Sequence, residues 1–128
     1  MKSNELFEKA HVALKSASLL LESKDFDGAC NRAYYAMFDA ARGALLTTNK
    51  VNDLSTIKTH SGLITQFSLH LVKTGKVPIE HGKAINKVED LRLIADYTDN
   101  AVTESNAKWA LAQAQSFVSA MQILVAHK

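Results

Sequence analysis

A group of charged and hydroxyl-bearing side chains stands near the end of the stretch EDLRLIADYTDN, residues 89–100. Arg92 and Asp96 are four residues apart, so on a helix they share one face and can form an ion pair. A guanidinium can also hold a phosphate and stabilise the charge that develops on it. The hydroxyl of Tyr97 can position a phosphate, or donate a proton if its pKa is lowered. The pattern therefore allows two interpretations, a structural ion pair or a phosphate-binding site.

A second candidate group lies earlier in the chain, where Arg32, Tyr35 and Asp39 follow one another at i, i+3 and i+7 along one edge of a helix. No lysine occurs from residue 26 to residue 48, and the polar edge includes an aromatic ring. An aromatic ring beside arginines suits a planar or phosphorylated ligand. A solvated helix face is the other interpretation.

The segment IKTHSG, residues 57–62, precedes an apolar run that is typical of a helix. The free amides and the dipole of a helix amino end favour an anion, and Lys58 and His60 would add positive charge there. His60 also titrates in the range that a general acid or base requires. Capping of the helix by Thr59 or Ser61 is the simpler explanation of the same segment.

Composition limits the other kinds of chemistry. The single cysteine, Cys30, cannot form an internal disulfide, and no spacing of cysteine and histidine resembles a metal site, so we expect no metal and no cofactor. Fifteen basic and 13 acidic residues give a net charge of +2, so any binding of nucleic acid must come from a local cluster. The amino end does not resemble a signal peptide, and no run of eighteen apolar residues occurs. We therefore expect a cytoplasmic protein without a membrane segment.

The elements that must position these residues are helices. A length of 128 residues predicts a single domain, residues 1–128, and one proline among many regularly spaced alanines and leucines predicts an all-α bundle of about five helices. The expected helices run from residue 6 to about 22, 26 to 48, 63 to about 73, 79 to about 98 and 104 to about 124. Asp25 and Thr103 are expected to cap the second and fifth helices, Gly75 to end the third, and Pro78 to begin the fourth.

Projection of two of these helices shows how they should pack. The second carries a row of small residues that would let a neighbouring helix approach closely. This row consists of Ala29, Ala33, Ala36, Ala40 and Gly43. The fourth helix has two polar stripes, and the stripe with Arg92 is bordered by apolar residues. A second polar stripe of this kind predicts a seam, which is an inner network, a subunit contact or a ligand cleft.

Three segments, ACNRAYYAMFDAARGALL, KTHSGL and LRLIADY, together resemble the HEPN superfamily, in particular its branch of small prokaryotic proteins. The resemblance covers nearly the whole chain. It implies an up-and-down helical bundle that is commonly a homodimer with a cleft between the protomers. Many relatives are metal-independent ribonucleases of toxin–antitoxin, CRISPR or phage-defence systems. Some are paired with a minimal nucleotidyltransferase, an antitoxin that adenylylates the HEPN subunit, and others are non-catalytic binding domains.

One departure from the HEPN nuclease pattern leaves the enzymatic activity open. Nuclease members carry an arginine and, after four to six further residues, a histidine. Arg92 matches the arginine, but Tyr97, Thr98 and Asp99 occupy the positions where the histidine would stand. Asp96 is a weak substitute as a base, because pairing with Arg92 would lower its affinity for a proton.

We therefore expect a dimeric HEPN protein that binds RNA or a nucleotide at a dimer cleft, the toxin-like member of a toxin–antitoxin or phage-defence pair, with endoribonuclease activity as a subsidiary expectation. The expected site consists of Arg32, Tyr35, Lys58, His60, Arg92, Asp96 and Tyr97. Arg92 would hold phosphate, Tyr97 would orient it or stack on a base, and His60 would transfer the proton. One alternative is a non-catalytic partner of a nucleotidyltransferase, with Tyr97 or Tyr35 as the acceptor. The other is a structural dimer in which the Arg92–Asp96 and Arg32–Asp39 pairs fix the packing register.

Overall fold

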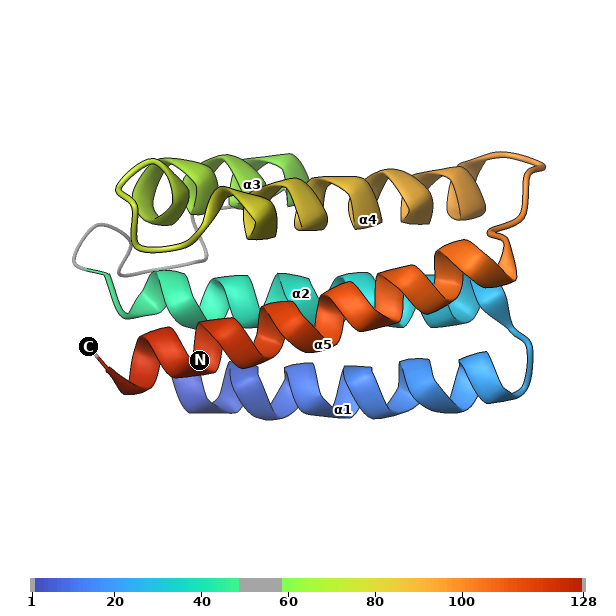
Figure 1. Cartoon of the computed structure of the whole chain (residues 1–128), viewed down its shortest axis with the longest axis horizontal. Coiled ribbons are helices and arrows are strands. Elements are labelled where there is room, and N and C mark those ends of the chain that lie inside the picture. Colours follow the sequence, from blue (N-terminus) through green and yellow to red (C-terminus); the bar gives the residue numbers. More distant parts are fainter. Residues whose placement is uncertain (1, 49–58, 128) are drawn as a thin grey trace.

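The described part of the chain consists of helices and the short connections between them. The computed structural model describes residues 2–48 and 59–127, and it contains no strand in these ranges. Its elements are α1 (Ser3–Glu22), α2 (Phe26–Leu46), α3 (His60–Phe67), the π-helical segment η2 (Ser68–Val72), α4 (Ile79–Tyr97) and α5 (Glu104–Ala126), as Figure 1 shows. The prediction of an all-α bundle of about five helices is confirmed.

The helix ends follow the local chemistry that the sequence indicates. Asp25 Oδ1 accepts a hydrogen bond from the Gly28 amide at 2.9 Å, and Thr103 Oγ1 accepts one from the Asn106 amide at 3.1 Å. Each bond satisfies an amide that has no partner within its helix. Gly75 adopts a φ of +79°, and it lies three residues beyond the end of η2. These predicted boundary residues are confirmed, and the predicted end of the second helix is two residues too late.

Helix α2 lies at the centre of the bundle and contacts α1, α3, α4 and α5. Gly43 shows why small residues are needed there, because a Cβ atom at this position would come within 2.9 Å of Phe7 Cε2 on α1. The Ser3 hydroxyl donates to the Gly43 carbonyl oxygen at 2.9 Å across the same contact. The alanines of the predicted row are fully buried. The close approach of α1 to α2 thus depends on this row.

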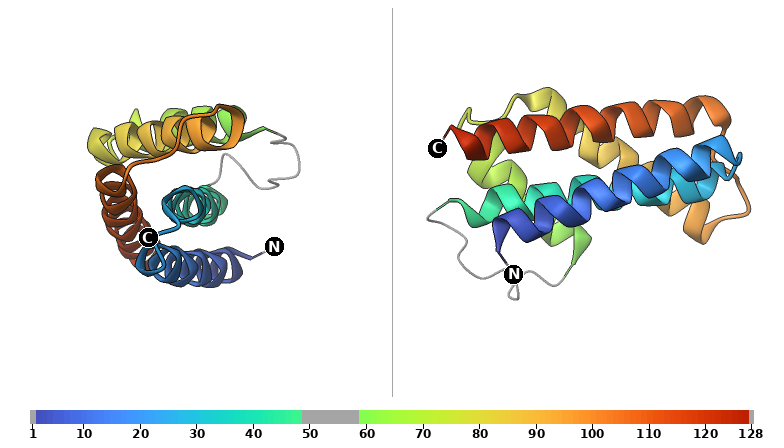
Figure 2. Two further views of the ribbon diagram at one scale, coloured as in Figure 1. Left: turned by 90° about the vertical axis from the view of Figure 1, so that its right-hand side faces the viewer. Right: turned by 90° about the horizontal axis from the view of Figure 1, so that it is seen from below.

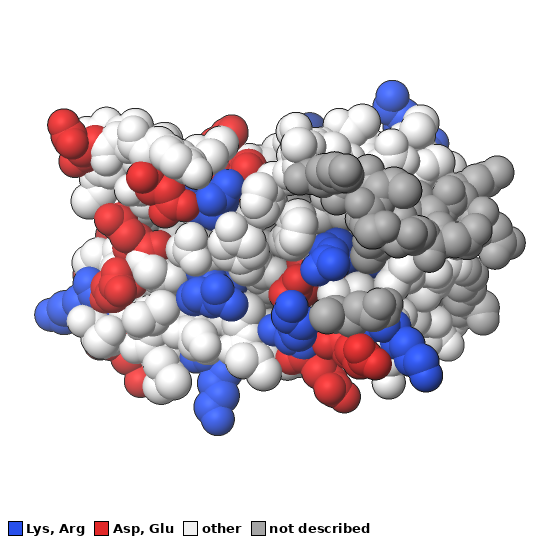
Figure 3. Space-filling view, turned by 180° about the vertical axis from the view of Figure 1, so that it is seen from behind, with Lys and Arg blue, Asp and Glu red and all other residues white. Residues whose placement is uncertain are grey.

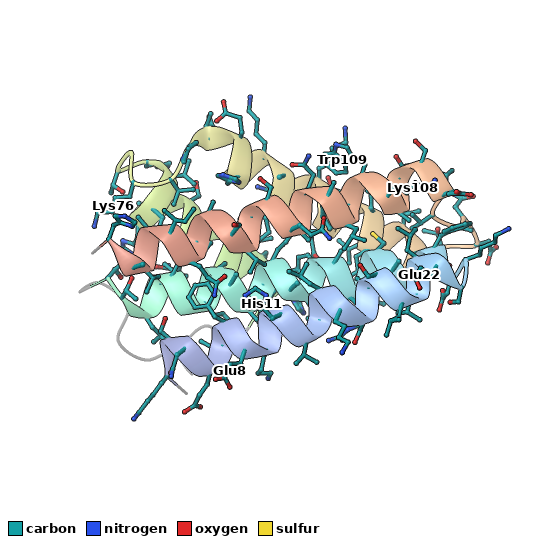
Figure 4. All side chains as sticks on the ribbon, turned by 60° about the horizontal axis from the view of Figure 1, so that its bottom comes forward. Glu8, His11, Glu22, Lys76, Lys108 and Trp109 are labelled. Atoms are coloured by element: carbon teal, nitrogen blue, oxygen red, sulfur yellow. The ribbon has the colours of Figure 1, made fainter. Side chains whose placement is uncertain are left out.

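Helix α5 covers α2 on another side and also contacts α1 and α4. His11 projects from α1 toward α5, and its Nε2 lies 2.9 Å from Gln122 Oε1 (Figure 4). Phe117 of α5 packs against Phe67 at the end of α3, with 5.4 Å between the ring centres. Within the described residues, no helix combines the length and the apolarity that crossing a bilayer requires.

Among the described residues, one side of α2 has no covering helix. In the left view of Figure 2, the layer of α3 and α4, then α5, then α1 form an arc around α2, and this arc is open on one side. Figure 3 looks onto that side and shows acidic and basic groups close together across it. We call this the open side of α2. It is the place where residues of α2, α3 and α4 meet.

Candidate functional site

The centre of the candidate site is the buried guanidinium of Arg92 on α4, of which only 5% is exposed. Its Nε and Nη2 donate to the two carboxylate oxygens of Glu89 at 2.9 and 3.1 Å, and its Nη1 donates to Asp96 Oδ2 at 2.9 Å. The hydrogen bonds to Glu89 raise the pKa of Arg92 above its ordinary value, against the opposing effect of burial. The arginine is therefore a permanent, fully paired cation.

The rings of α2 form the surface on which this guanidinium rests. Arg92 Cζ lies 4.9 Å from the ring centre of Tyr34 and 5.7 Å from that of Tyr35. Both distances are within the range of a cation–π contact, which is strengthened when the cation is withdrawn from water. The seam predicted on α4 is thus real, and it is an inner contact with α2.

Pairing within α4 limits what Arg92 can bind. The expected ion pair between Arg92 and Asp96 is present, and Glu89 adds a second, bidentate pair. The cluster therefore contains one basic and two acidic groups. The carboxylates take three of the five guanidinium N–H groups, and the side chain of Arg92 is only 6% exposed. A phosphate would therefore gain access to the guanidinium by displacing a carboxylate, and Asp96 is the more accessible of the two, with 32% of its side chain exposed against 13% for Glu89.

Tyr34 connects Arg92 to His60. Its hydroxyl oxygen lies 3.0 Å from His60 Nδ1, which belongs to the first residue of α3. Burial raises the pKa of Tyr34, and the neighbouring Glu89 carboxylate raises it further, so the phenol stays neutral. His60 and Arg92 are 32 residues apart by number, yet both contact one ring.

His60 also packs against the other aromatic rings of α2. Its ring centre lies 4.8 Å from that of Phe38 and 5.7 Å from that of Tyr35. Because Tyr34 occupies Nδ1, the second ring nitrogen, Nε2, is the one that remains for a ligand. His60 and Arg92 therefore contact the same two aromatic rings of α2, Tyr34 and Tyr35, and local sequence patterns do not predict these contacts.

Arginines flank the aromatic rings along the open side of α2. Arg32 Cζ lies 5.6 Å from the ring centre of Tyr35, and Arg42 Cζ lies 5.5 Å from that of Phe38. Asp39 pairs with Arg42 at 3.4 Å, whereas the sequence analysis paired it with Arg32. Arg42 follows Asp39 by three residues, about one turn of helix, whereas Arg32 precedes it by seven residues, about two turns. The Asp39 carboxylate is therefore closer to Arg42.

Asp39 itself is almost fully buried. Burial raises the pKa of its carboxyl group, and the charges of Lys9 and Arg42 act in the opposite direction. The acidic group on this face therefore serves to hold Arg42 and is poorly placed to meet a ligand.

Two other residues of the expected site, and the expected cap of α3, have different outcomes. Tyr97 is 76% exposed and is not brought to Arg92, because five residues correspond to about 140° around a helix. Lys58 lies outside the described residues. Thr59 Oγ1 accepts a hydrogen bond from the Gly62 amide at 2.9 Å, so the capping explanation of the IKTHSG segment is confirmed.

Tyr34 is the site residue that the sequence analysis missed. Helical spacing places it beside the apolar residues of α2, and it is fully buried. The signal available in the sequence was the hydroxyl, because a buried tyrosine normally has a hydrogen-bond partner. The sequence could not name that partner, which lies 26 residues further along the chain.

The Cys30 thiol is not activated as a nucleophile. The Cys30 thiol is buried, and burial, followed by the charges of Asp27 and Asp96, raises its pKa to about 12. A thiol that stays protonated is a poor nucleophile. Across residues 2–48 and 59–127, no three histidine, cysteine, aspartate or glutamate side chains are grouped to hold a metal ion.

Comparison with known proteins identifies the family. The family model of the HEPN domain matches residues 3–124. This chain belongs to the HEPN family. The match includes α2, α3 and α4, so the site described above lies within the HEPN domain.

Relatives cover almost the same length. A "UPF0332 protein" of Gloeobacter violaceus is 35% identical over 96% of each chain. A protein of Methanocaldococcus jannaschii named "Putative toxin" is 39% identical over 88% of this chain and 81% of its own. A "UPF0332 protein" of Thermotoga maritima is 36% identical over 91% of this chain and 86% of its own.

The burial of Cys30 predicts a measurable dependence of stability on pH. Its thiol has an ordinary pKa of 9.0 and a folded-state pKa of about 12, so the unfolded chain ionises first and the folded state loses stability as the pH rises from 9 to 12. This thiol alone contributes a slope of up to about 1.4 kcal/mol per pH unit. Urea unfolding of the wild type and of Cys30→Ala across this range measures it. The variant should show the shallower decline, and two parallel curves would contradict the burial of the thiol.

Proposed function

We propose that this HEPN protein binds RNA or a nucleotide on the open side of α2. The observation that supports the proposal is the alternation of arginines and aromatic rings, Arg32 beside Tyr35 and Arg42 beside Phe38. Stacking of a base on an aromatic side chain contributes about 1–3 kcal/mol, and arginines supply contacts to the phosphates. All four of these side chains are only partly buried.

The proposed biological role is that of the toxin-like member of a toxin–antitoxin or phage-defence pair. The support is the family and the name of the Methanocaldococcus jannaschii relative. In this proposal a second copy of the chain faces the open side of α2, so that the ligand lies in a cleft between two protomers. A nucleotidyltransferase is the proposed antitoxin partner.

The charges of the site assign different tasks to its arginines. Arg32 and Arg42 are only half-buried, so they can contact phosphates without a rearrangement of the site. Arg92 is held by two carboxylates, so it would contact phosphate only after Asp96 or Glu89 moved away. Arg92 therefore serves first to position the rings of α2, and its predicted contact with phosphate is a second step.

RNA cleavage is the subsidiary part of the proposal. In this step the 2′-oxygen bonds to phosphorus and the bond from phosphorus to the 5′-oxygen breaks. A group must accept the proton of the 2′-hydroxyl near neutral pH and return a proton to the departing 5′-oxygen, and His60 is the candidate. When His60 Nδ1 carries the proton and donates it to the Tyr34 hydroxyl oxygen, Nε2 presents a lone pair that can accept the proton from the substrate. A guanidinium can stabilise the charge on the phosphorus oxygens, which is the role proposed for Arg92 once it is released.

Tyr97 favours a second candidate function, that of a nucleotide acceptor for a nucleotidyltransferase. Of the three tyrosines, Tyr34 is fully buried and Tyr35 is half-buried, whereas Tyr97 is 76% exposed at the end of α4. A modifying enzyme needs an accessible hydroxyl. Tyr97 is therefore the acceptor in this second proposal, which needs no catalysis by the HEPN chain itself.

Binding to a fluorescein-labelled single-stranded RNA tests the main proposal. Tyr35→Leu keeps an apolar side chain but removes the stacking surface, so we expect its affinity to fall about tenfold. Arg32→Gln should reduce the slope of log affinity against log salt concentration by about 1, the amount expected for the loss of one phosphate contact. Fluorescence anisotropy over a series of salt concentrations measures both effects.

The matched control is Lys87→Ala. Lys87 makes a cation–π contact of the same kind, 5.4 Å from the ring centre of Trp109, but on another side of α4. Its removal should leave the affinity unchanged. Equal affinities for the wild type, Tyr35→Leu and Arg32→Gln would reject RNA binding at the open side. If the wild type cleaves the RNA, the His60→Gln variant should bind the RNA but not cleave it. If the wild type leaves the RNA intact, the proposal of RNA cleavage is rejected and the proposal of RNA binding is not affected.

Intact-mass measurement tests the acceptor role of Tyr97. After co-expression with a nucleotidyltransferase encoded beside it, the wild type should gain the mass of one or more nucleotidyl groups. Tyr97→Phe should lose this gain because it lacks the acceptor oxygen, while Tyr35→Phe should retain it. A gain that persists in Tyr97→Phe, or no gain in the wild type, would exclude Tyr97 as the acceptor.

A further inference from the structure

A basic, apolar region lies on the layer of α3 and α4, apart from the residues of the proposed RNA site. From residue 59 to residue 79 the sequence contains no aspartate and no glutamate, but it contains Lys73 and Lys76. Lys83 follows on the first half of α4. None of these three lysines forms an ion pair with another described residue. Lys76 lies at the end of the molecule where η2 connects to α4 (Figure 4).

A groove of about 250 Å³ separates this segment from α4. Its floor is apolar and includes Phe67, Val72 and Ile79, and its rim carries Lys73 and Lys83. Ile79 is 56% exposed, so its side chain is available to a partner. Pockets that enclose a small ligand usually measure roughly 300–1,000 Å³. The groove is therefore suited to a few side chains of a larger partner.

The backbone on both sides shapes the groove. In η2 the Lys73 amide donates to the Ser68 carbonyl oxygen at 2.8 Å, a bond of the i→i+5 type that defines a π-turn. In an α-helix, Lys73 would point about 140° away from Ser68 around the helix axis. The π-turn has more residues per turn, so Lys73 projects from nearly the same side as Ser68, which is the side that lines the groove. On the opposite wall, a Cβ atom on Gly82 would come 3.2 Å from Val72 Cγ2, so glycine allows α4 to approach η2.

We propose that this groove docks an acidic segment of another protein that also carries aliphatic or aromatic side chains. The apolar side chains would contact Val72 and Ile79, and the carboxylates would pair with Lys73 and Lys83. The argument is charge complementarity, because the lining contains two unpaired lysines and no acidic group. An RNA backbone would use the lysines but would leave the apolar floor without a contact. A partner peptide uses both.

Selection from a random 12-residue peptide library against the immobilised full chain tests this inference. Enriched peptides should combine aspartate or glutamate with leucine, isoleucine or phenylalanine. Reversing both rim charges with Lys73→Glu and Lys83→Glu should weaken their binding at least about tenfold. Ile79→Ser should weaken it as well, because the floor contributes to the contact. All three residues are exposed, so the melting temperature should change little.

Matched controls separate this groove from other surfaces. Lys108→Glu reverses an exposed lysine on α5 and should leave peptide binding unchanged. The outcome that overturns the proposal is the absence of enriched peptides, the enrichment of basic peptides, or equal binding to the charge-reversed variant. Displacement of the peptides by oligouridine would assign the groove to RNA and would overturn the proposal. Concentration-dependent self-association that Lys73→Glu and Lys83→Glu abolish would assign the groove to a second copy of the chain and would also overturn it.

Discussion

The burial of one positive charge against two aromatic rings determines how this bundle is assembled on its open side. A buried guanidinium must be paired, because an unpaired charge away from water is strongly unfavourable. Arg92 receives its carboxylates from Glu89 and Asp96 of its own helix, so α2 has to supply only the faces of Tyr34 and Tyr35. Helix α4 can therefore pack a charge against α2 without an acidic group on α2 at that point.

The same contact fixes the start of α3. Because Arg92 rests on the Tyr34 ring, the phenol is buried, and its hydroxyl needs a hydrogen-bond partner. His60 supplies that partner as the first residue of α3, and Thr59 caps the helix immediately before it. A structural ion-pair cluster and a candidate proton-transfer group are thus joined through one tyrosine. The structural and functional interpretations of Arg92 are compatible, since the pairing positions the rings that the proposed ligand would contact.

Much of the fold could be predicted because its causes are local. Asp25 and Thr103 cap helices through hydrogen bonds that span three residues, and the Arg92–Asp96 pair follows from the pitch of a helix. The contact of His60 with Tyr34 depends on how α3 packs across α2, and local periodicity carries no information on it. Tyr97 was placed with Arg92 on the basis of a sequence motif, although helix geometry turns it by about 140°. The π-turn of η2 likewise had no sequence signal that the analysis could use.

A double-mutant cycle between Glu89 and Arg92 tests the central claim most directly. Urea unfolding of Arg92→Met should show a loss of about 3 kcal/mol, because Glu89 is left nearly buried without its partner. The double variant Glu89→Gln/Arg92→Met should recover much of that loss, giving a coupling free energy of about 2 kcal/mol. The exposed Glu104–Lys108 pair should show no measurable coupling in a parallel cycle. A coupling free energy between Glu89 and Arg92 that is close to zero, like that of the exposed pair, would contradict a buried guanidinium held against the rings of α2 by its carboxylate partners.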